Sequence, residues 1–445
     1  MISRTEPERK PLTVIVVGAG FGGLAAAIEC RRRGMEVILL EKHKAIVSYG
    51  DVSDFFANSG RIINTWGDGA VARRMYKASI HNKSHDIHKY DGELIFSDSF
   101  TGVDSPEEDE SITFIGHRVE MHFIVYDYAV EIGVKFKFDS PVVDYFENAL
   151  SAGVKTKSGE LIMGDVVIAA DGPKSLAKLK ILGIQDKSIN GGYAIYRSFF
   201  DVDDAIYASE EDHIQLFLGS HVHFIVFNWN KGRDMAWVLT HKDDHDIQES
   251  WSFPGCKEDV YDFLKQEAWS PILKAIVDKT PDDRIVDYKF VYRDSLPTWL
   301  SNGGRMAVIG DAAHTHLPTS AQGASQAMED AVTFAICLEK SPDDVRLAFK
   351  AAERIKESGV TNRDVWHGIT DETWEMFRKN PEKVRVPRLE WVVGFDPMQA
   401  VYDNYDKVVE EIREGKQGTL AELSMPAGGS FSDYIEAYQT VKVVE

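Results

Sequence analysis

Cysteine is scarce in this sequence, and long apolar runs are missing. Three cysteines, Cys30, Cys256 and Cys337, are scattered along 445 residues. This pattern excludes a disulfide framework and a cysteine-rich metal site, and favours buried thiols in a reducing compartment. The longest apolar runs, such as VIVV near residue 14, have the length of a strand, whereas a membrane helix needs about 20 apolar residues. The charged first ten residues carry no apolar signal core. We therefore expect a cytoplasmic protein with no integral membrane segment.

Positive charge is also scarce. The chain has 50 Lys and Arg against 71 Asp and Glu, a formal net charge of −21. Such a surface repels phosphate backbones, so nucleic acid is not an expected partner. The motifs G-x-S-x-G, H-E-x-x-H and paired C-x-x-C are absent, which argues against a serine hydrolase and a metal enzyme. An anionic cofactor would need local helix dipoles and a few well-placed cations.

A glycine-rich turn follows the first apolar strand. The segment GAGFGG places Gly18, Gly20 and Gly23 in the pattern G-x-G-x-x-G between VIVV and the helical stretch GLAAAIECRRR. The first glycine allows a tight turn, the second lets the backbone approach a diphosphate, and the third lets helix and strand pack closely. Glu41 ends the next strand, where a carboxylate can accept hydrogen bonds from ribose hydroxyls. A dinucleotide site is predicted; the alternative is a glycine turn that serves packing alone.

Two later strands also end in an aspartate. DVVIAADGPKS (165–175) ends at Asp171, and GRMAVIGDAAH (304–314) ends at Asp311. Ligands of open parallel sheets bind beyond the carboxyl ends of the strands, so both aspartates should point into the crevice of the glycine turn. Three strand-end positions along one ligand indicate FAD in preference to NAD.

Residues from about 190 to 295 contain β-rich segments such as YAIYRSFF, HIQLFLG and HVHFIVFNW. The predicted fold class is therefore α/β: a Rossmann-like FAD-binding domain with an inserted mixed β-sheet substrate domain and a C-terminal helical segment. The predicted boundaries are 11–76, 111–180 and 296–345 for the FAD-binding domain, 77–110 and 181–295 for the substrate domain, and 346–445 for the helical region.

The three motifs GAGFGG, VVIAADG and GDAAHTHLPTSAQGASQAMEDA resemble those of the single-component FAD-dependent aromatic hydroxylases, the salicylate and para-hydroxybenzoate hydroxylase group. The segment IVSYGDVSDFFANSGRIINTWGDGAV is similar to fungal secondary-metabolite members, including indole-epoxidising ones. The resemblance spans residues 14 to about 340. It implies a monooxygenase that consumes NAD(P)H and inserts one oxygen of O2 into an electron-rich aromatic or indole-type substrate through a flavin C4a-hydroperoxide.

Other functions stay open at this point. An oxidase or dehydrogenase of the same fold would bind FAD without inserting oxygen, and a flavin-binding protein could keep the fold without catalysis. The specific substrate, the choice between NADH and NADPH and the oligomeric state are not predicted.

The resemblance also implies cofactor contacts. Asp311 is expected at the ribityl chain, and Pro318 at the wall beside the isoalloxazine. Gly323 and Ala324 would let helix N–H groups meet the pyrimidine edge, where the helix dipole favours the negative charge of reduced flavin. Arg118 matches the arginine that reaches the diphosphate or ribityl region.

Two cofactor positions depart from the family pattern. Asp171 matches the aspartate that positions FAD, but Lys178 follows it where relatives often carry arginine. Lysine cannot make the bidentate phosphate contact of arginine. Asp54 stands where relatives usually have glycine, in a turn near the flavin. If the flavin is contacted by the backbone at this position, the contact is kept when aspartate replaces glycine.

The candidate catalytic residues are chosen by the needs of a flavin enzyme, which relies on its protein for exclusion of water, orientation of the substrate and control of protons. Arg197 in YAIYRSFF matches a family position that faces the flavin; the alternative is a structural ion pair. Asp51 in SYGD resembles a proton-relaying acid of the indole-epoxidising relatives, and otherwise is a turn or capping aspartate. His223 in HVHFIVFNW could line the substrate pocket, and otherwise is an ordinary sheet histidine.

Overall fold

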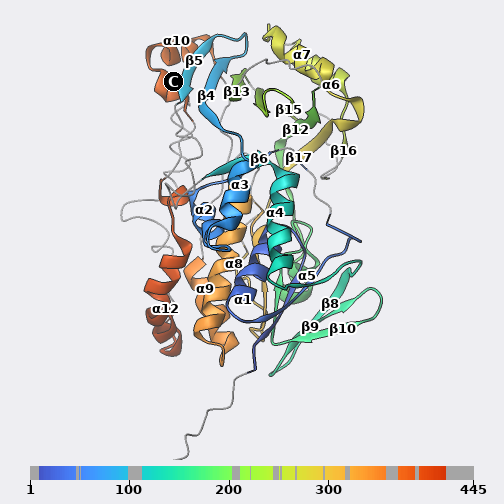
Figure 1. Ribbon diagram of the computed structural model, residues 1–445, viewed down its shortest axis with the longest axis vertical. Helices are drawn as coiled ribbons and strands as arrows, with labels where there is room; N and C mark the ends of the chain where they lie inside the picture. The colour runs from blue at the N-terminus through green and yellow to red at the C-terminus, as the bar shows by residue number, and fades with distance from the viewer. Residues whose placement is uncertain are drawn as a thin grey trace, which may run out of the picture.

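The structure is a computed structural model, in which the described residues form four sheets with helices around them (Figure 1). It describes residues 10–46, 50, 52–98, 113–202, 211–220, 222–243, 250, 253–265, 268–293, 296–315, 321–356, 369–385 and 390–416. Within these ranges no helix is both long and apolar enough to cross a membrane.

The first sheet is parallel throughout and has the strand order β18-β11-β1-β2-β7. Its strands are β1 (Thr13–Val17), β2 (Glu36–Leu40), β7 (Lys135–Lys137), β11 (Val166–Ala169) and β18 (Met306–Val308). Val14 of β1 pairs with Val37 on one side and Val166 on the other. The strands β11, β1 and β18 are continuous apolar runs because both of their faces are covered. Their carboxyl ends lie at one edge of the sheet.

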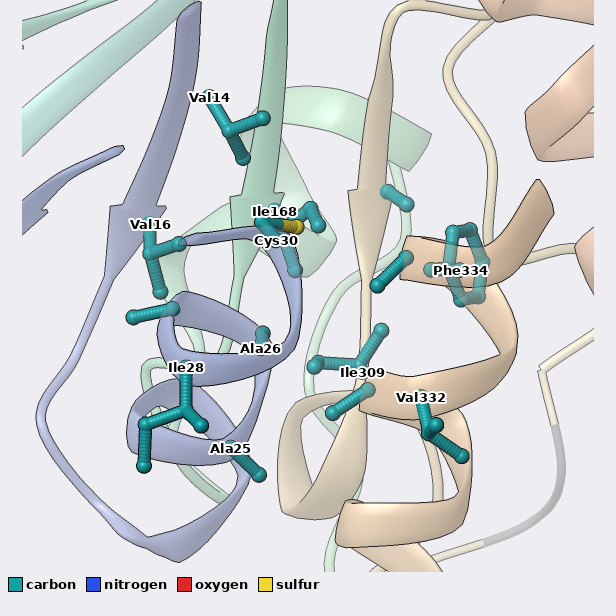
Figure 2. Close-up of a cluster of buried hydrophobic side chains, with 14 of the residues drawn as sticks. Val14, Val16, Ala25, Ala26, Ile28, Cys30, Ile168, Ile309, Val332 and Phe334 are labelled. Atoms are coloured by element: carbon teal, nitrogen blue, oxygen red, sulfur yellow. The ribbon is translucent and has the colours of Figure 1, made fainter. Parts of the chain in front are cut away.

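Helices built from small residues pack against this sheet. Ala25, Ala26 and Ala27 of α1 (Phe21–Arg32) are fully buried. A Cβ on Gly22 would lie 3.1 Å from the Cβ of Ala327 in α8 (Gly323–Lys340), so the two helices approach closely. Figure 2 shows Val16 of β1 on the side of α1, near Ala26 and Ile28, and Ile309 beside Val332 of α8. This contact places the start of α8 next to the glycine turn.

The other helices of this layer surround α1 and α8 (Figure 1). They are α2 (Ala57–Asn64), α3 (Ala70–Lys77), α4 (Arg118–Glu131), α5 (Leu176–Leu182), α9 (Val345–Lys356), α11 (Glu390–Val393) and α12 (Pro397–Arg413). A three-stranded sheet of β8 (Val142–Glu147), β9 (Ala152–Thr156) and β10 (Leu161–Gly164) packs against the parallel sheet, and its hairpin turns at Gly159 with φ +92°.

The largest sheet has eight strands in the order β16-β17-β12-β15-β14-β13-β4-β5. They are β4 (Asn82–Lys89), β5 (Leu94–Asp98), β12 (Ile189–Asp201), β13 (Asp212–Leu218), β14 (His223–Trp229), β15 (Asp234–Lys242), β16 (Phe253–Pro254) and β17 (Val286–Tyr292). The pair β4–β13 is parallel and the others are antiparallel, so the sheet is mixed. The predicted fold class is confirmed.

The two faces of the eight-stranded sheet have different neighbours because side chains alternate along each strand. One face, with Tyr196 and Trp237, is covered by α6 (Lys257–Leu264) and α7 (Pro271–Lys279). The other face packs against a ribbon of β3 (Val52–Phe55) and β6 (Phe114–His117). The helix α10 (Asp371–Lys379) lies against β4 and β5, near the 3-10 turn Pro381–Val384. Another 3-10 turn, Asp282–Arg284, precedes β17.

The cysteines only partly match their prediction. Cys30 and Cys337 are buried in the main core, and burial raises the pKa of Cys30 to about 12. Cys256 is exposed, so its predicted burial is wrong: it is the residue that precedes the first turn of α6 at the surface.

One buried side-chain amide in the large sheet has no hydrogen-bond partner in the described part of the chain. The side chain of Asn228 is fully buried, and neither its nitrogen nor its oxygen has a partner among the described residues. Because an unsatisfied buried polar group costs roughly 1–3 kcal/mol, we expect Asn228→Leu to raise the free energy of unfolding by about 1 kcal/mol. Thermal or urea unfolding would measure it. Asn190→Leu is the control, since Asn190 is exposed and accepts a hydrogen bond from Gly192. A lower stability for Asn228→Leu alone would contradict this account.

Candidate active site

The three glycines of the first turn have different surroundings. A Cβ on Gly18 would overlap the carbonyl oxygen of Ala170 in the neighbouring strand connection, and a Cβ on Gly23 would overlap that of Gly18. Gly18 also has φ +100°, which disfavours other residues. A Cβ on Gly20 would meet nothing within 4 Å. Two glycines therefore serve packing, while Gly20 leaves open backbone at the start of α1, where a diphosphate would bind.

Glu41 is tied to this turn. One carboxylate oxygen accepts the Ala19 N–H at 2.9 Å, and the other accepts the His43 N–H at 3.0 Å. A carboxylate has about four lone-pair sites, so it can still accept from ribose hydroxyls. The position of Glu41 after β2 agrees with the sequence prediction.

His122 supports the turn from α4, and sequence reasoning missed it. Its Nε2 donates to the Ala19 carbonyl at 2.7 Å, and its ring packs edge-on against Phe21 at 5.0 Å between centroids. Burial and the nearby Arg118 lower the pKa of His122 to about 4, so the ring is neutral near pH 7. A sequence signal existed, because His122 follows Arg118 by four residues and so shares its helix face.

Arg118 lies beside the same turn. It is the first residue of α4, and its guanidinium carbon is 5.0 Å from the centroid of the Phe21 ring. A Cβ on Gly50 would lie 2.6 Å from Cδ of Arg118, so the chain at Gly50 passes directly over this side chain. The next residue, Asp51, lies outside the described residues.

Asp54 is in a strand. It belongs to β3 and pairs with Ile115 of β6 in an antiparallel ladder. The prediction of a turn at this position is therefore wrong: the ladder between β3 and β6 holds the backbone extended, and glycine is not needed there.

The Asp171–Gly172 turn presents both bonded and unbonded groups. One carboxylate oxygen of Asp171 accepts the Ala177 N–H at 3.2 Å and faces the Tyr145 hydroxyl at 3.5 Å. The other oxygen is buried and has no partner in the part of the chain that the structure describes. Gly172 has φ +86° and open space where a Cβ would point. A ligand hydroxyl could satisfy the remaining oxygen.

Lys178 is buried in an ion network. Its ammonium lies 2.6 Å from Asp186 and donates to the carbonyl of Pro173 at 3.0 Å. Arg293 contacts the same aspartate with two nitrogens, at 2.7 and 2.8 Å. Arg293 and Lys178, working against burial, lower the pKa of Asp186 to about 2. The charge of Lys178 thus stabilises the turn after β11, which the sequence comparison with arginine-bearing relatives did not anticipate.

Asp311 lies where four segments meet. It is in the 3-10 turn Gly310–Ala312, just beyond β18. Burial raises its pKa, while the charges of His314, Arg118, Arg293 and Lys178 act in the opposite direction. These residues come from the motif itself, α4, the position just after β17 and α5, so groups that are widely separated in the sequence act on this carboxyl.

The helix α8 begins with open backbone. A Cβ on Gly323 would meet nothing within 4 Å, and the side chain of the preceding Gln322 does not cap the helix. Ser325 bonds to Ser59 at 2.9 Å and accepts the Phe56 N–H at 3.3 Å, which joins α2 to this turn. The N-terminal N–H groups at Gly323 and Ala324 therefore lie at the positive end of the helix dipole, where the backbone at Gly323 is not crowded. Pro318 lies outside the described residues.

Arg197 and His223 share the face of the large sheet that packs on the β3–β6 ribbon. Arg197 is buried, with its guanidinium carbon 5.5 Å from the ring of Tyr288. His223 lies two strands away, and its Nε2 is 2.8 Å from Oγ1 of Thr240. Both side chains point away from α6 and α7, toward the half of the molecule that carries the strand ends.

This set of residues fits FAD. Gly20, Gly172 and Gly323 leave open backbone at strand and helix ends, Glu41 and Asp171 retain acceptor capacity, and Arg118 supplies a cation. An acidic protein with such a site can hold a long anionic cofactor through local dipoles.

Comparison with known proteins agrees with the geometry. The family described as "FAD binding domain" matches residues 11–341. Asperlicin C monooxygenase of Petromyces alliaceus is 31% identical, covering 96% of this chain and 94% of that protein. The FAD-dependent monooxygenase nanF of Aspergillus nanangensis is 28% identical, and the match covers 96% of this chain and 95% of that protein.

Solved structures give the same result. A crystal structure of CtdE in complex with FAD and substrate 4 is similar with a TM-score of 0.80 and 29% identity, covering 90% of this chain and 100% of that chain. A crystal structure of FqzB is similar with a TM-score of 0.78 and 29% identity, and the match covers 95% of this chain and 99% of that chain. The chain belongs to the FAD-dependent monooxygenases, oxidoreductases that bind FAD through the domain matched here at residues 11–341.

Proposed function

We propose that this enzyme consumes NAD(P)H and inserts one oxygen of O2 into an electron-rich aromatic or indole-type small molecule. One observation carries the proposal: β6 joins the strand-end site to the inner face of the large sheet. Ile115 of β6 packs against that face, and Arg118, three residues later, lies beside the glycine turn. A substrate bound on the sheet face would therefore lie next to the cofactor.

In this proposal each cofactor contact has a physical role. Gly18, Gly20 and Gly23 shape the turn for the diphosphate, with Arg118 as the neighbouring cation, and Glu41 accepts from the ribose. The remaining contacts to the ribityl chain and the flavin ring come from Asp54, Asp171, Asp311, Pro318, Gly323 and Ala324. When bound, FAD supplies the activation of O2.

The protein's own task is to hold the substrate and manage protons. Arg197, buried on the sheet face, would orient an anionic or carbonyl group of the substrate. His223, whose Nε2 is held by Thr240, would line the pocket and exchange a proton. Asp51 is proposed as a proton relay from the segment beside Gly50. The domain division into FAD-binding, substrate and C-terminal helical parts belongs to the same proposal, as does a cytoplasmic location.

The substrate class has two supports. Asperlicin C monooxygenase carries the name of its small-molecule substrate, and CtdE was crystallised with a substrate. The sheet face itself is aromatic: Phe199, Phe227 and Tyr288 share it with Arg197. A flat aromatic ring packs well against such a surface.

The proposal is tested with purified FAD-loaded enzyme, NADH or NADPH, and a panel of phenols and indoles under ¹⁸O2. We expect a panel member to accelerate NAD(P)H oxidation and to gain a single labelled oxygen. NAD(P)H-independent substrate oxidation with peroxide release and no label in the product would instead identify an oxidase of the same fold.

Loss of Asp311 should weaken FAD binding. Asp311→Ala removes an acceptor at the centre of the four segments, and a hydrogen bond to a charged group contributes roughly 1.5–3 kcal/mol, so the Kd for FAD should rise about 10- to 100-fold. Fluorescence titration of the apoprotein measures this. Asp127→Ala, an exposed aspartate of α4, is the control. Unchanged affinity in Asp311→Ala would refute the assignment of the motif.

Loss of Arg197 should affect chemistry and leave FAD in place. In Arg197→Gln we expect bound FAD with near-normal affinity, at least tenfold less product per NAD(P)H consumed and more hydrogen peroxide. Arg233→Gln, an exposed arginine in the turn just before β15, is the control. Fully coupled turnover in Arg197→Gln would remove this residue from the active site.

A further inference from the structure

A group of polar side chains, all of them buried except the half-buried His314, lies behind the first turns of α8. We call Asn58, His314, Gln326, Glu329, Asp330 and Lys356 the α8 cluster. Lys356, at the end of α9, has only 3% of its surface exposed. Its ammonium is 2.9 Å from Glu329, 2.9 Å from the Gln326 amide oxygen and 3.5 Å from Asp330. Burying a lysine between two buried carboxylates costs desolvation free energy that is recovered only if each charge is paired. We therefore ask what the buried Lys356 does for the protein.

The first branch of the α8 cluster leads to the helix start. Glu329 accepts hydrogen bonds from the amides of Asn58, at 2.5 Å, and Gln326, at 3.0 Å. The Asn58 amide also donates to Gln322 at 3.1 Å. Gln322 immediately precedes Gly323, the first residue of α8. Lys356 is thus connected through Glu329 and Asn58 to the turn whose N–H groups are proposed to contact the flavin.

The second branch leads to the strand-end aspartate. Asp330 accepts the Gly310 N–H at 2.8 Å and a hydrogen bond from Nε2 of His314 at 2.6 Å. Gly310 precedes Asp311 in the 3-10 turn. The same carboxylate also faces the ammonium of Lys356. One lysine therefore supports both segments that are proposed to contact the flavin ring and the ribityl chain.

The charges of the α8 cluster depend on one another. Burial alone would lower the pKa of Lys356, but Glu329 and Asp330 raise it above its usual value. Burial raises the pKa of Glu329 even beside Lys356. If the ammonium were removed, Glu329 would take up a proton or leave its partners, and the bonds to Asn58 and Gln326 would rearrange.

We propose that Lys356 is a positioning residue for the cofactor, which through Glu329 and Asp330 fixes the start of α8 and the Gly310–Asp311 turn together. The inference rests on the placement of FAD in the proposed function. Because the helix N–H groups stabilise the negative charge of reduced flavin more than the neutral oxidised ring, a loosened helix start should weaken binding of reduced FAD preferentially.

Variants of the full-length protein separate positioning from mere stability. Lys356→Met removes the charge and keeps the length, and Lys356→Arg keeps the charge. The double variant Lys356→Met/Glu329→Gln removes the charge of Lys356 together with that of Glu329, and Asp330 keeps its hydrogen bonds from Gly310 and His314. Lys350→Met, an exposed lysine of the same helix, is the control. The readouts are the Kd for FAD, the midpoint potential of bound FAD and the melting temperature of the apoprotein.

We expect Lys356→Met to bind FAD at least tenfold more weakly. Its preference for reduced FAD should fall about tenfold, a shift of about 30 mV to more negative potential for a two-electron couple. Lys356→Arg should recover most of both values. The double variant should recover the melting temperature of the apoprotein but not the potential. If Lys356→Met is too unstable to purify, the Kd for FAD and the midpoint potential of the double variant test the proposal.

The proposal is overturned if the potential and FAD affinity of a folded Lys356→Met or double variant equal those of the wild type, or if Lys350→Met shows the same shifts. Its failure differs from failure of the proposed function. The potential and Kd are measured without substrate or O2, whereas the proposed function fails if no labelled oxygen enters any product of the wild-type enzyme.

Discussion

The parallel order β18-β11-β1 is the constraint on which the site depends. Three neighbouring strands with the same direction end at one edge, and each of them leads into a turn and not into another strand. The close contact of α1 with α8, made possible by Gly22 and Ala327, then brings the start of α8 to the same edge. Residues as distant in the sequence as Gly20, Asp171 and Asp311 become neighbours because the sheet is parallel. The FAD-binding site is in this sense a consequence of strand order and helix packing.

Electrostatics at this edge run against the charge of the whole chain. The net charge of −21 would repel a dinucleotide. Arg118, Lys178 and Arg293 lie close enough to Asp311 to influence its pKa, and the starts of α1 and α8 add positive dipole ends. Lys178 and Arg293 are themselves anchored by Asp186. The site therefore relies on a few cations held in fixed positions, which makes their supporting contacts as important as the cations.

Much of this architecture was predictable from the sequence, because its signals are local. The glycine pattern, the acid after β2 and the apolar strands that end in aspartate depend on neighbouring residues, and the alternation in the β-rich segments indicated the sheet strands. The prediction of a turn at Asp54 was wrong because Asp54 pairs with Ile115 of β6, and this contact is distant in the sequence. The α8 cluster was not predictable: Glu329 belongs to the flavin motif 310–331, but its partners Asn58 and Lys356 come from two other helices, and nothing in the sequence connects them. Side chains whose role depends on tertiary packing leave little trace in one sequence.

The measurement that tests the central claim most directly is a crystal structure of this enzyme with FAD. The account predicts the diphosphate against Gly20 and the start of α1, the ribityl chain beside Asp311, and the flavin ring between the start of α8 and the sheet face that carries Arg197. A diphosphate bound away from the glycine turn would contradict it. So would a ring held on the far side of the large sheet, against α6 and α7.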